Sequence, residues 1–361
     1  MTPIRVLIVD DSAVIRRLLT AVIDTDPAID VVGVAHDGQM GLQRIDELQP
    51  DLVTLDVEMP IMDGITTLRH IRKRYPRLPV VMFSTLTERG ASATIEALSL
   101  GASDYVTKPS NVGSIGVAIE RVKEQLIPKI KALCPRPSAV PRPIPVVAAP
   151  RPRPATTGFD VVAIGSSTGG PSALREVLTA LPSSFPLPIV ITQHMPPLFT
   201  KQLADRLHDG CAISVREAAT GDLLAPGLAL IAPGDRHLVF ERKANGVTAK
   251  LSDGQAENVC RPSVDTMLRS VHATFGGRVL TVMLTGMGAD GCKETGLLRD
   301  AGGYVITQDE ASSVVWGMPG AVVHAGFSDA VVPLDDVARA IVDRVATTGS
   351  RPTRPRPAVS V

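Results

Sequence analysis

The stretch VLIVDD, residues 6–11, decides the fold of the first half of the chain. Its four apolar residues in a row predict a strand buried on both faces, which is typical of a parallel sheet between two layers of helices. Similar apolar runs follow at 31–34, 52–55, 80–83 and 105–106, separated by amphipathic stretches such as 13–23 and 64–74. Five such units of strand and helix predict a doubly wound parallel α/β sheet.

Charged side chains follow several of these runs directly. Asp10 and Asp11 follow the first run, Asp56 the third, and Lys108 comes shortly after the fifth. Because the ends of parallel strands share one edge of a sheet, we expect the three carboxylates to lie close together and to raise one another's pKa. Mg²⁺ binds carboxylate and phosphate oxygens and would remove that conflict. The alternative is that an acid such as Asp11 or Asp56 only caps the helix that follows it.

Three strings in this half, VLIVDDS, LDVEMPIMDG and YVTKP, resemble the receiver domain of two-component response regulators. The resemblance implies that Asp56 is the phosphoacceptor and that a chemotaxis histidine kinase is the phosphodonor. It also implies that Asp10, Asp11 and Asp56 hold Mg²⁺ together with the backbone carbonyl of Glu58. A phosphorylatable aspartate of this kind predicts a regulatory role for residues 1–133.

The same resemblance assigns three residues to the switch that follows phosphorylation. Ser84 is the expected switch hydroxyl, Lys108 the contact to the phosphate, and Tyr105 the aromatic side chain that changes rotamer. The segment between the hydroxyl and the lysine is two residues longer here than in most receivers. This extra length leaves the choice between Ser84 and Thr85 open.

A segment rich in proline and arginine separates the two halves. Residues 134–155 contain eight prolines, four arginines and no acid. Such a composition cannot pack a core and favours extended polyproline-type conformations. We therefore expect domains over residues 1–133 and 158–346, a linker over 134–157, and a disordered tail over 347–361.

The alternation of apolar runs and helical stretches resumes in the second half. Runs at 161–164, 189–191, 228–231, 279–284 and 304–306, with helical stretches such as 172–180 and 262–273, predict a second α/β domain with a mainly parallel sheet. Ser167, His194 and Asp290 each lie beyond one of these runs. Ligands bind at such strand ends in open sheets, so these three residues are candidates for one site.

The stretch GSSTGG, residues 165–170, predicts a sharp turn into a helix whose free N–H groups could stabilise an oxyanion or bind a phosphate. The Gly-Lys-Ser/Thr pattern of a phosphate loop is absent. Ser167 is then the candidate nucleophile and His194 the candidate general base. Asp290 could hold the imidazole in the required tautomer, or it could simply cap a helix.

The strings GSSTGGPSALREVL, ITQHMPP, IAPGDRHL, CRPSVD, LTGMGADG and WGMPG occur in this order and resemble the catalytic domain of the chemotaxis receptor methylesterases. The resemblance implies a Ser167–His194–Asp290 triad, with an oxyanion hole at the backbone of Thr168 and Met287. The family more often has alanine at position 166, so the Ser166 hydroxyl must be distinguished from the nucleophile.

The implied function is a phosphorylation-activated hydrolase. It would demethylate glutamate γ-methyl esters on the cytoplasmic helices of chemotaxis receptors and deamidate glutamine side chains, with no cofactor for the esterase itself. The alternative is a response regulator whose second domain binds a ligand without catalysis. A serine-directed covalent probe distinguishes the two.

The amino-acid composition argues against several other classes of protein. Lys+Arg and Asp+Glu are equal at 37 each and aromatic residues make up 3% of the chain, which argues against a nucleic-acid binder. The four cysteines lack Cys-x-x-Cys spacing, so we predict no zinc site and a reducing compartment. No leader precedes residue 6 and no apolar run approaches the ~20 residues of a membrane span. We expect a cytoplasmic monomer without membrane insertion.

Overall fold

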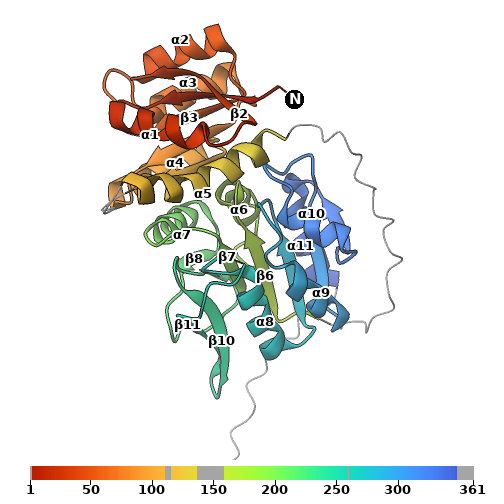
Figure 1. The fold of residues 1–361 in the computed structure, drawn as a ribbon. Coiled ribbons are helices and arrows are strands. Elements are labelled where there is room, and N and C mark those ends of the chain that lie inside the picture. The colour runs from red at the N-terminus through yellow and green to blue at the C-terminus, as the bar shows by residue number, and fades with distance from the viewer. Residues whose placement is uncertain (1, 110–114, 136–157, 259, 348–361) are drawn as a thin grey trace, which may run out of the picture.

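The computed structural model describes residues 2–109, 115–135, 158–258 and 260–347. In these ranges the chain forms two parallel sheets covered by helices, and one separate antiparallel hairpin (Figure 1). The α/β prediction for both halves is therefore confirmed. Beyond its first two residues the expected linker lies outside the described residues, as does the expected tail beyond residue 347.

The first sheet has five parallel strands in the order β2-β1-β3-β4-β5. Every residue of β3 and β4 is buried, as expected for strands with helices on both faces. The order reverses between β1 and β3, so the ends of these strands lie side by side where open sheets bind ligands. The strands are β1 (Ile4–Val9), β2 (Ile29–Ala35), β3 (Leu52–Asp56), β4 (Val80–Ser84) and β5 (Asp104–Thr107).

The helices of the first half begin at well-defined caps. The side chains of Ser12, Asp37, Asp63 and Thr87 each accept a hydrogen bond from a backbone N–H in the first turn of α1, α2, α3 and α4. The predicted bounds of α1 and α3 agree with the structure. The helices are α1 (Ala13–Ile23), α2 (Gly38–Leu48), α3 (Gly64–Arg74), α4 (Glu88–Ser99) and α5 (Ile115–Leu133).

The second sheet has seven parallel strands in the order β14-β13-β12-β6-β7-β9-β8. Its strands are β6 (Val161–Ser166), β7 (Ile189–Gln193), β8 (Ser214–Glu217), β9 (Leu228–Ile231), β12 (Val279–Met283), β13 (Tyr304–Gln308) and β14 (Ala330–Val332). The antiparallel hairpin consists of β10 (His237–Lys243) and β11 (Gly246–Ser252). The helices are α6 (Gly170–Thr179), α7 (Phe199–Gly210), α8 (Val264–Phe275), α9 (Cys292–Asp300), α10 (Met318–His324) and α11 (Leu334–Thr347).

The sequence analysis did not predict β8, β14 or the hairpin. β8 and β14 are the two edge strands of the second sheet, and only one of their seven residues, Val215, is buried. The hairpin strands mix apolar and charged residues because much of their surface is exposed. Charged residues interrupt the apolar runs of β8 and of the hairpin, and β14 is only three apolar residues long, none of them buried.

A helical layer joins the two halves. α4 packs against α6 and α7, between the two sheets (Figure 1). The Tyr105 ring at β5 stacks on the Phe199 ring at the start of α7, with centroids 4.8 Å apart and planes 12° from parallel. The Ser172 hydroxyl donates to the Leu98 carbonyl at 2.8 Å. Buried apolar residues of both halves form one continuous cluster, so the first half is docked firmly on the second.

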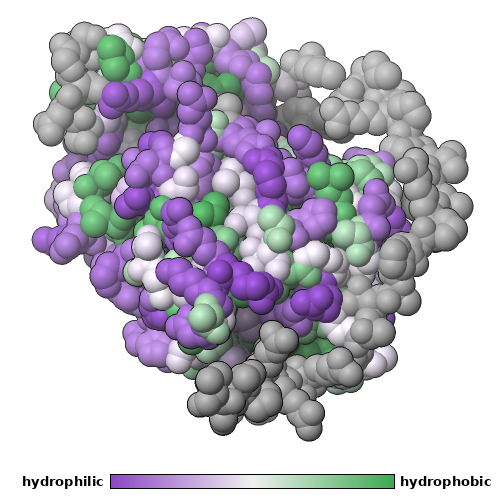
Figure 2. Space-filling model, turned by 90° about the horizontal axis from the view of Figure 1, so that it is seen from below, coloured by the Kyte–Doolittle hydropathy of each residue, from purple (hydrophilic) through white to green (hydrophobic). Residues whose placement is uncertain are grey.

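The outer surface is mixed in character. On the face shown in Figure 2, hydrophobic residues form small groups among hydrophilic ones. Scattered exposed apolar residues of this kind are normal for folded proteins. No helix within the described ranges has both the length and the hydropathy needed to cross a bilayer.

Candidate functional site

Asp10, Asp11 and Asp56 meet at the edge of the first sheet. One carboxylate oxygen from each lies within 4.8 Å of those of the other two. Asp10 and Asp56 are buried, whereas Asp11 is exposed. Nζ of Lys108 lies 3.0 Å from Oδ2 of Asp10 and 2.7 Å from Oδ2 of Asp56. The fold thus brings together the acids and the lysine that the sequence analysis singled out.

The electrostatics of this pocket leave negative charge only partly balanced. Burial and the charge of Asp10 raise the pKa of Asp56 to about 6, against the opposing effect of Lys108. Burial also raises the pKa of Asp10, whose Oδ2 is buried and, within the part of the chain that the structure describes, has no partner besides its ion pair with Lys108. A cation that prefers oxygen ligands fits such a set, so Asp10, Asp11 and Asp56 would hold Mg²⁺.

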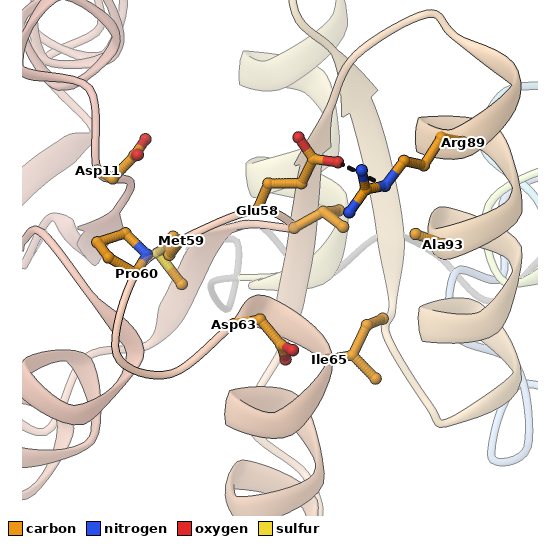
Figure 3. Close-up of a pocket in the computed structure, with 9 residues that line it drawn as sticks. Asp11, Glu58, Met59, Pro60, Asp63, Ile65, Arg89 and Ala93 are labelled. Atoms are coloured by element: carbon orange, nitrogen blue, oxygen red, sulfur yellow. Dashed lines mark ion pairs between the residues drawn. The ribbon is translucent and has the colours of Figure 1, made fainter.

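A groove beside this pocket is lined by the loop after β3 and by α4 (Figure 3). The carboxylate of Glu58 points toward Arg89 and away from Asp11, with 3.2 Å between Oε1 and the guanidinium Nε (Figure 3). Both partners are exposed, so this ion pair contributes little to stability. The Glu58 side chain is directed away from the acids, and only its backbone carbonyl remains as the metal ligand that the prediction assigns.

Two hydroxyls lie near the predicted phosphoacceptor. Ser84, at the end of β4, is buried, and Thr85 next to it is exposed. Both line a pocket of about 200 Å³ together with Asp56 and Lys108. Ser84 Oγ donates to the Gly90 carbonyl at 3.1 Å. The pocket geometry admits either hydroxyl, so the switch role of Ser84 stays a prediction.

Ser167 stands in the turn between β6 and α6, where backbone contacts fix it on both sides. Its N–H donates to the Thr285 carbonyl at 3.0 Å, and its own carbonyl accepts from the Gly170 N–H at 2.7 Å. Gly169 has a φ of +77°, which glycine adopts without strain. A Cβ added to Gly286 would lie 2.9 Å from Cβ of Ser167, so only glycine allows this close approach. The Ser167 side chain remains partly exposed.

The neighbouring hydroxyl, Ser166, has a different environment. Ser166 is fully buried, and its Oγ donates to Oε1 of Gln193 at 2.7 Å. Nε2 of Gln193 in turn donates to the Ser167 carbonyl at 2.9 Å. The Ser166 hydroxyl therefore helps to hold the turn and does not face the surface from which a substrate would approach.

His194 lies next to Ser167 across the sheet. The register of β6 and β7 places Ser166 opposite Gln193, and the His194 N–H donates to the Ser166 carbonyl at 3.1 Å. Continuing that register by one residue puts His194 beside Ser167. Oγ of Ser167 makes no hydrogen bond to any described residue, and catalytic hydrogen bonds often tighten only when substrate binds.

Asp290 holds the ring of His194, with 2.8 Å between Nε2 and Oδ2. This contact leaves Nδ1 of His194 as the nitrogen that Asp290 does not engage. The carboxylate of Asp290 is surrounded by further donors: Asn258 Nδ2 at 2.7 Å, Ser263 Oγ at 2.9 Å, Val264 N–H at 2.7 Å and Asp265 N–H at 3.2 Å. The last three donors form the start of α8, whose N-terminus favours negative charge.

These contacts shift the two pKa values in opposite directions. Burial would raise the pKa of Asp290, but the hydrogen bond and charge of His194, with the donors of Asn258 and Val264, hold it well below its usual range. Burial would lower the pKa of His194, but contacts with Asp290 and Cys260 raise it to about 9. An imidazolium paired with a carboxylate is therefore the stable form in this conformation.

The sequence analysis did not assign a role to the donors around Asp290. Ser263, Val264 and Asp265 lie within CRPSVD, a string quoted only as part of the resemblance, and Asn258 lies just before it. The available signal was Ser263, because a serine before an apolar stretch with helical periodicity predicts the start of a helix. The free N–H groups at such a start can bind an acid from elsewhere in the chain. Asp290 thus both orients His194 and caps α8.

Two backbone N–H groups near Ser167 in the chain or in space have no acceptor among the described residues. The N–H groups of Thr168 and Met287 donate to no described residue. Thr168 lies in the turn before α6, one residue before its N-cap Gly169. Met287 follows Gly286, the residue that approaches Ser167 closely. The oxyanion hole that the sequence analysis assigned to these two amides stays a prediction.

The first half of the chain covers this region. A groove of about 440 Å³ runs between His194 and Cys260 on one side and Tyr105 and Lys129 on the other. At its boundary, Asp104 Oδ2 accepts a hydrogen bond from the Thr168 hydroxyl at 2.6 Å. Lys129 Nζ lies 3.0 Å from the other oxygen of Asp104. A carboxylate of the first half thus holds the residue next to Ser167.

Both halves of the chain match known protein families. Residues 162–341 match the CheB methylesterase family, and residues 6–120 match the response regulator receiver domain family. Two relatives are named protein-glutamate methylesterase/protein-glutamine glutaminase. The one from Nocardioides sp. is 50% identical over 354 residues and covers 96% of each chain. The one from Trichodesmium erythraeum is 47% identical over 358 residues and covers 96% of this chain and 100% of the relative.

A solved structure resembles the second half. The crystal structure of the Thermotoga maritima CheB methylesterase catalytic domain matches with a TM-score of 0.51 and 40% sequence identity. The match covers 52% of this chain and 100% of that chain. At this level of identity the likeness extends beyond the fold to the sequence of the second half.

Proposed function

The chain belongs to the CheB methylesterase family, and from this premise we propose that it is a phosphorylation-activated enzyme that hydrolyses glutamate γ-methyl esters on chemotaxis receptors. The name of its relatives includes a glutaminase activity, and the same chemistry on a glutamine side chain yields glutamate and ammonia. The observation that supports the proposal most directly is the pair of His194 and Asp290, 2.8 Å apart, beside the turn that presents Ser167.

The reaction follows from the hydrogen bonds around the imidazole. In the neutral form of His194, Nε2–H donates to Asp290, and Nδ1 carries the lone pair that accepts the proton of Ser167. Oγ of Ser167 attacks the ester carbonyl, and the N–H groups of Thr168 and Met287 stabilise the oxyanion. Collapse releases methanol, which takes the proton from Nδ1. Water then attacks the acyl-serine by the same route and leaves a free glutamate.

Regulation starts at the first site. A chemotaxis histidine kinase donates the phosphoryl group to Asp56, and Lys108 contacts the phosphate. When bound, Mg²⁺ supplies positive charge that balances the acids and the incoming phosphoryl oxygens. Ser84 and Tyr105 respond to the modification. Tyr105 stacks on Phe199, so a change at Tyr105 alters a contact with the second half.

In the unphosphorylated state the first half restrains the esterase. Asp104 holds the hydroxyl of Thr168, and Tyr105 and Lys129 narrow the groove beside His194. Phosphorylation shifts the population toward a form in which these contacts are released. The reaction takes place in the cytoplasm, where receptor helices and the kinase are accessible, and the active species is a monomer.

The competing function is a response regulator whose second domain only binds a ligand. The free amides beside a partly exposed serine, next to a paired histidine and aspartate, favour hydrolysis because binding alone requires no such set. A fluorophosphonate probe tests this directly, since it labels only an activated serine. Labelling of Ser167, absent in Ser167→Ala, is expected. Absence of labelling in the wild-type protein would favour the binding function.

The substrate is tested by methanol release from membranes that contain methylated receptor. Release is expected with the wild-type protein and is expected to increase with a small-molecule phosphodonor and Mg²⁺. Ser167→Ala serves as the blank for spontaneous hydrolysis. A protein that reacts with the probe but releases no methanol would be a serine esterase with another substrate.

A further inference from the structure

Cys260 lines the groove beside His194, which we call the catalytic groove, and the proposed hydrolysis does not use its thiol. It lies just before α8, its side chain is half-buried, and it lines the groove together with His194. Its Sγ is 3.7 Å from Nδ1 of His194. This is the nitrogen that Asp290 leaves free and that the proposed mechanism needs as the base. A thiol and the reactive nitrogen of the triad therefore face each other.

The spacing of these two atoms suits a metal ion. In a tetrahedral zinc site, with Zn–N of about 2.0 Å and Zn–S of about 2.3 Å, the two ligand atoms lie about 3.5 Å apart. The separation of 3.7 Å between Nδ1 and Sγ approaches that value. Imidazole nitrogen and thiolate sulfur also bind Zn²⁺ in preference to Mg²⁺. Both the distance and the chemistry of the donors thus fit zinc.

Asp290 completes the arrangement without binding the metal. It lies in the same cluster, in which the ligand atoms of His194, Cys260 and Asp290 are within 4.8 Å of one another. Its Oδ2 already accepts from Nε2 of His194 and from the Val264 N–H. A histidine that binds zinc usually donates its other N–H to a carboxylate in this way, which orients the ring and raises its basicity.

We infer that the catalytic groove binds Zn²⁺ through Nδ1 of His194 and Sγ of Cys260, and that this binding inhibits the esterase. The Zn–S bond replaces the S–H bond of Cys260, and the Zn–N bond replaces the N–H bond at Nδ1 wherever His194 is an imidazolium, so each ion bound releases the thiol proton and, in that state, the Nδ1 proton as well. The Ser167 hydroxyl or water from the open groove fills the remaining positions. Inhibition follows because the metal occupies the lone pair that accepts the proton of Ser167, and this consequence rests on the proposed function.

The binding test uses the full-length protein with excess Mg²⁺, which occupies the oxygen-rich site of the receiver. Zn²⁺ binding is measured by equilibrium dialysis for the wild-type protein, for Cys260→Ser and for Cys211→Ser. Cys211 is a matched control, because it is also half-buried and lies away from the groove at the end of α7. The wild-type protein and Cys211→Ser are expected to bind equally. Cys260→Ser should bind at least about tenfold more weakly, since it loses a ligand.

Cobalt provides a second readout that does not depend on activity. Co²⁺ in the wild-type site should show thiolate-to-metal charge-transfer absorption, and Cys260→Ser should lack it. His194→Gln, which keeps the thiol, is expected to lose tight zinc binding as well. Equal zinc affinity in the wild-type protein and Cys260→Ser, or no binding by either, would overturn the inference.

The inhibition is then measured by methanol release. Zn²⁺ should inhibit the wild-type enzyme, a chelator should restore it, and Cys260→Ser should require at least about tenfold more Zn²⁺ for the same inhibition. If the protein releases no methanol under any condition, the proposed function fails while dialysis and the cobalt spectrum still report on the site. If zinc binds through Cys260 but does not inhibit, the inhibitory part of the inference is wrong.

Discussion

Two buried aspartates, Asp56 in the first half and Asp290 in the second, occupy comparable places and have opposite properties. Each lies at the carboxyl edge of a parallel sheet, beside a cationic partner. The pKa of Asp56 is raised to about 6, whereas the pKa of Asp290 lies well below its usual range. The difference comes from the neighbours. Burial raises the pKa of both carboxyl groups. At Asp56 the charge of Asp10 adds to this effect against Lys108, whereas at Asp290 the hydrogen bond and charge of His194, with the donors of Asn258 and Val264, outweigh it.

In the first site the negative charge of the carboxylates is only partly balanced. In the second, the negative charge of Asp290 is already balanced by His194 and by hydrogen-bond donors. Oδ2 of Asp10 beside Asp56 is incompletely satisfied, so the Mg²⁺ and phosphoryl group of the proposed function would strongly change the electrostatic energy of this site. The oxygens of Asp290 are fully engaged, so the imidazole of His194 is held in one orientation before substrate arrives. Regulation requires the first kind of site and catalysis the second.

Removal of the nucleophile is the strongest test of the preorganised site. Ser167→Ala is expected to lower kcat by on the order of 10⁴-fold or more, because no acyl-enzyme can form. Ser166→Ala is the matched control: it removes a buried hydrogen bond to Gln193 and should cost far less activity. The measurement is methanol release under saturating substrate. Equal losses in the two variants would mean that the nucleophile is assigned wrongly.

Asp290→Asn tests whether the engaged carboxylate has a catalytic role. An amide cannot favour the His194 tautomer with a proton on Nε2, so kcat should fall by on the order of 10³- to 10⁴-fold. The matched control is Asp265→Asn, at the same helix start. Asp265 accepts hydrogen bonds from Asn258 and from the Glu294 N–H and does not contact His194. A comparable loss in both variants would point to a structural role for the whole cluster.

The pH dependence of the unphosphorylated enzyme tests the coupling of His194 to Asp290. The base must be neutral, and the pKa of His194 is raised to about 9 in the docked conformation. The kcat/KM should therefore rise by roughly 100-fold between pH 7 and the plateau above pH 9. The assay contains a zinc chelator, and Ser167→Ala is subtracted to remove hydroxide-catalysed hydrolysis.

The pH profile of Asp290→Asn shows whether Asp290 raises or lowers the pKa of His194. Loss of the negative charge lowers the pKa of His194, so the rising limb should move to lower pH while the plateau falls. A limb that stays in place would show that Asp290 does not set the pKa of His194.

Sequence patterns predicted the parallel strands and the candidate residues because both depend on local signals. A buried strand is a continuous apolar run, and each candidate follows such a run within a few residues. Their assembly at one sheet edge then follows from the topology of parallel sheets. This is why Ser167, His194 and Asp290 could be named together although they are far apart in the chain.

Other parts of the site could not be predicted because they depend on contacts across the chain. Cys260 meets His194 across 66 residues, and Thr168 meets Asp104 across 64. The absence of Cys-x-x-Cys spacing therefore gave no information about a pairing of one cysteine with one histidine. The docking of the two halves likewise depends on surfaces such as Tyr105 and Phe199, whose partners no local pattern identifies.

The contact between the halves is tested by Asp104→Ala, which removes the acceptor for the Thr168 hydroxyl. A buried hydrogen bond to a charged group contributes about 1.5–3 kcal/mol, so resting activity should rise by roughly 10-fold or more if docking restrains the esterase. The matched control is Glu96→Gln, which breaks an exposed ion pair with Arg69 within the first half. Thermal unfolding verifies that the receiver remains folded. Unchanged resting activity in Asp104→Ala would argue against restraint through this contact.

Asp56→Asn should have the smallest effect on resting activity and the clearest effect on regulation. The substitution keeps the shape of the side chain but removes the phosphoacceptor and one of the repelling charges. Methanol release without phosphodonor should stay within about twofold, because Asp56 does not contact the catalytic groove. Addition of phosphodonor and Mg²⁺ should then give no stimulation. Asp63→Asn, which preserves a cap of α3 beside the neighbouring groove, should respond like the wild-type protein.

These variants would show that Asp56 and Asp290 have different functions. Asp290→Asn should lower the rate in both phosphorylation states, because it acts on the chemistry. Asp56→Asn should leave the unphosphorylated rate intact and abolish only its response to phosphodonor. If Asp56→Asn instead raised resting activity as strongly as Asp104→Ala, the repulsion within the acid pocket would itself be part of what keeps the first half docked. The charge state of Asp56, and not phosphorylation alone, would then control the esterase.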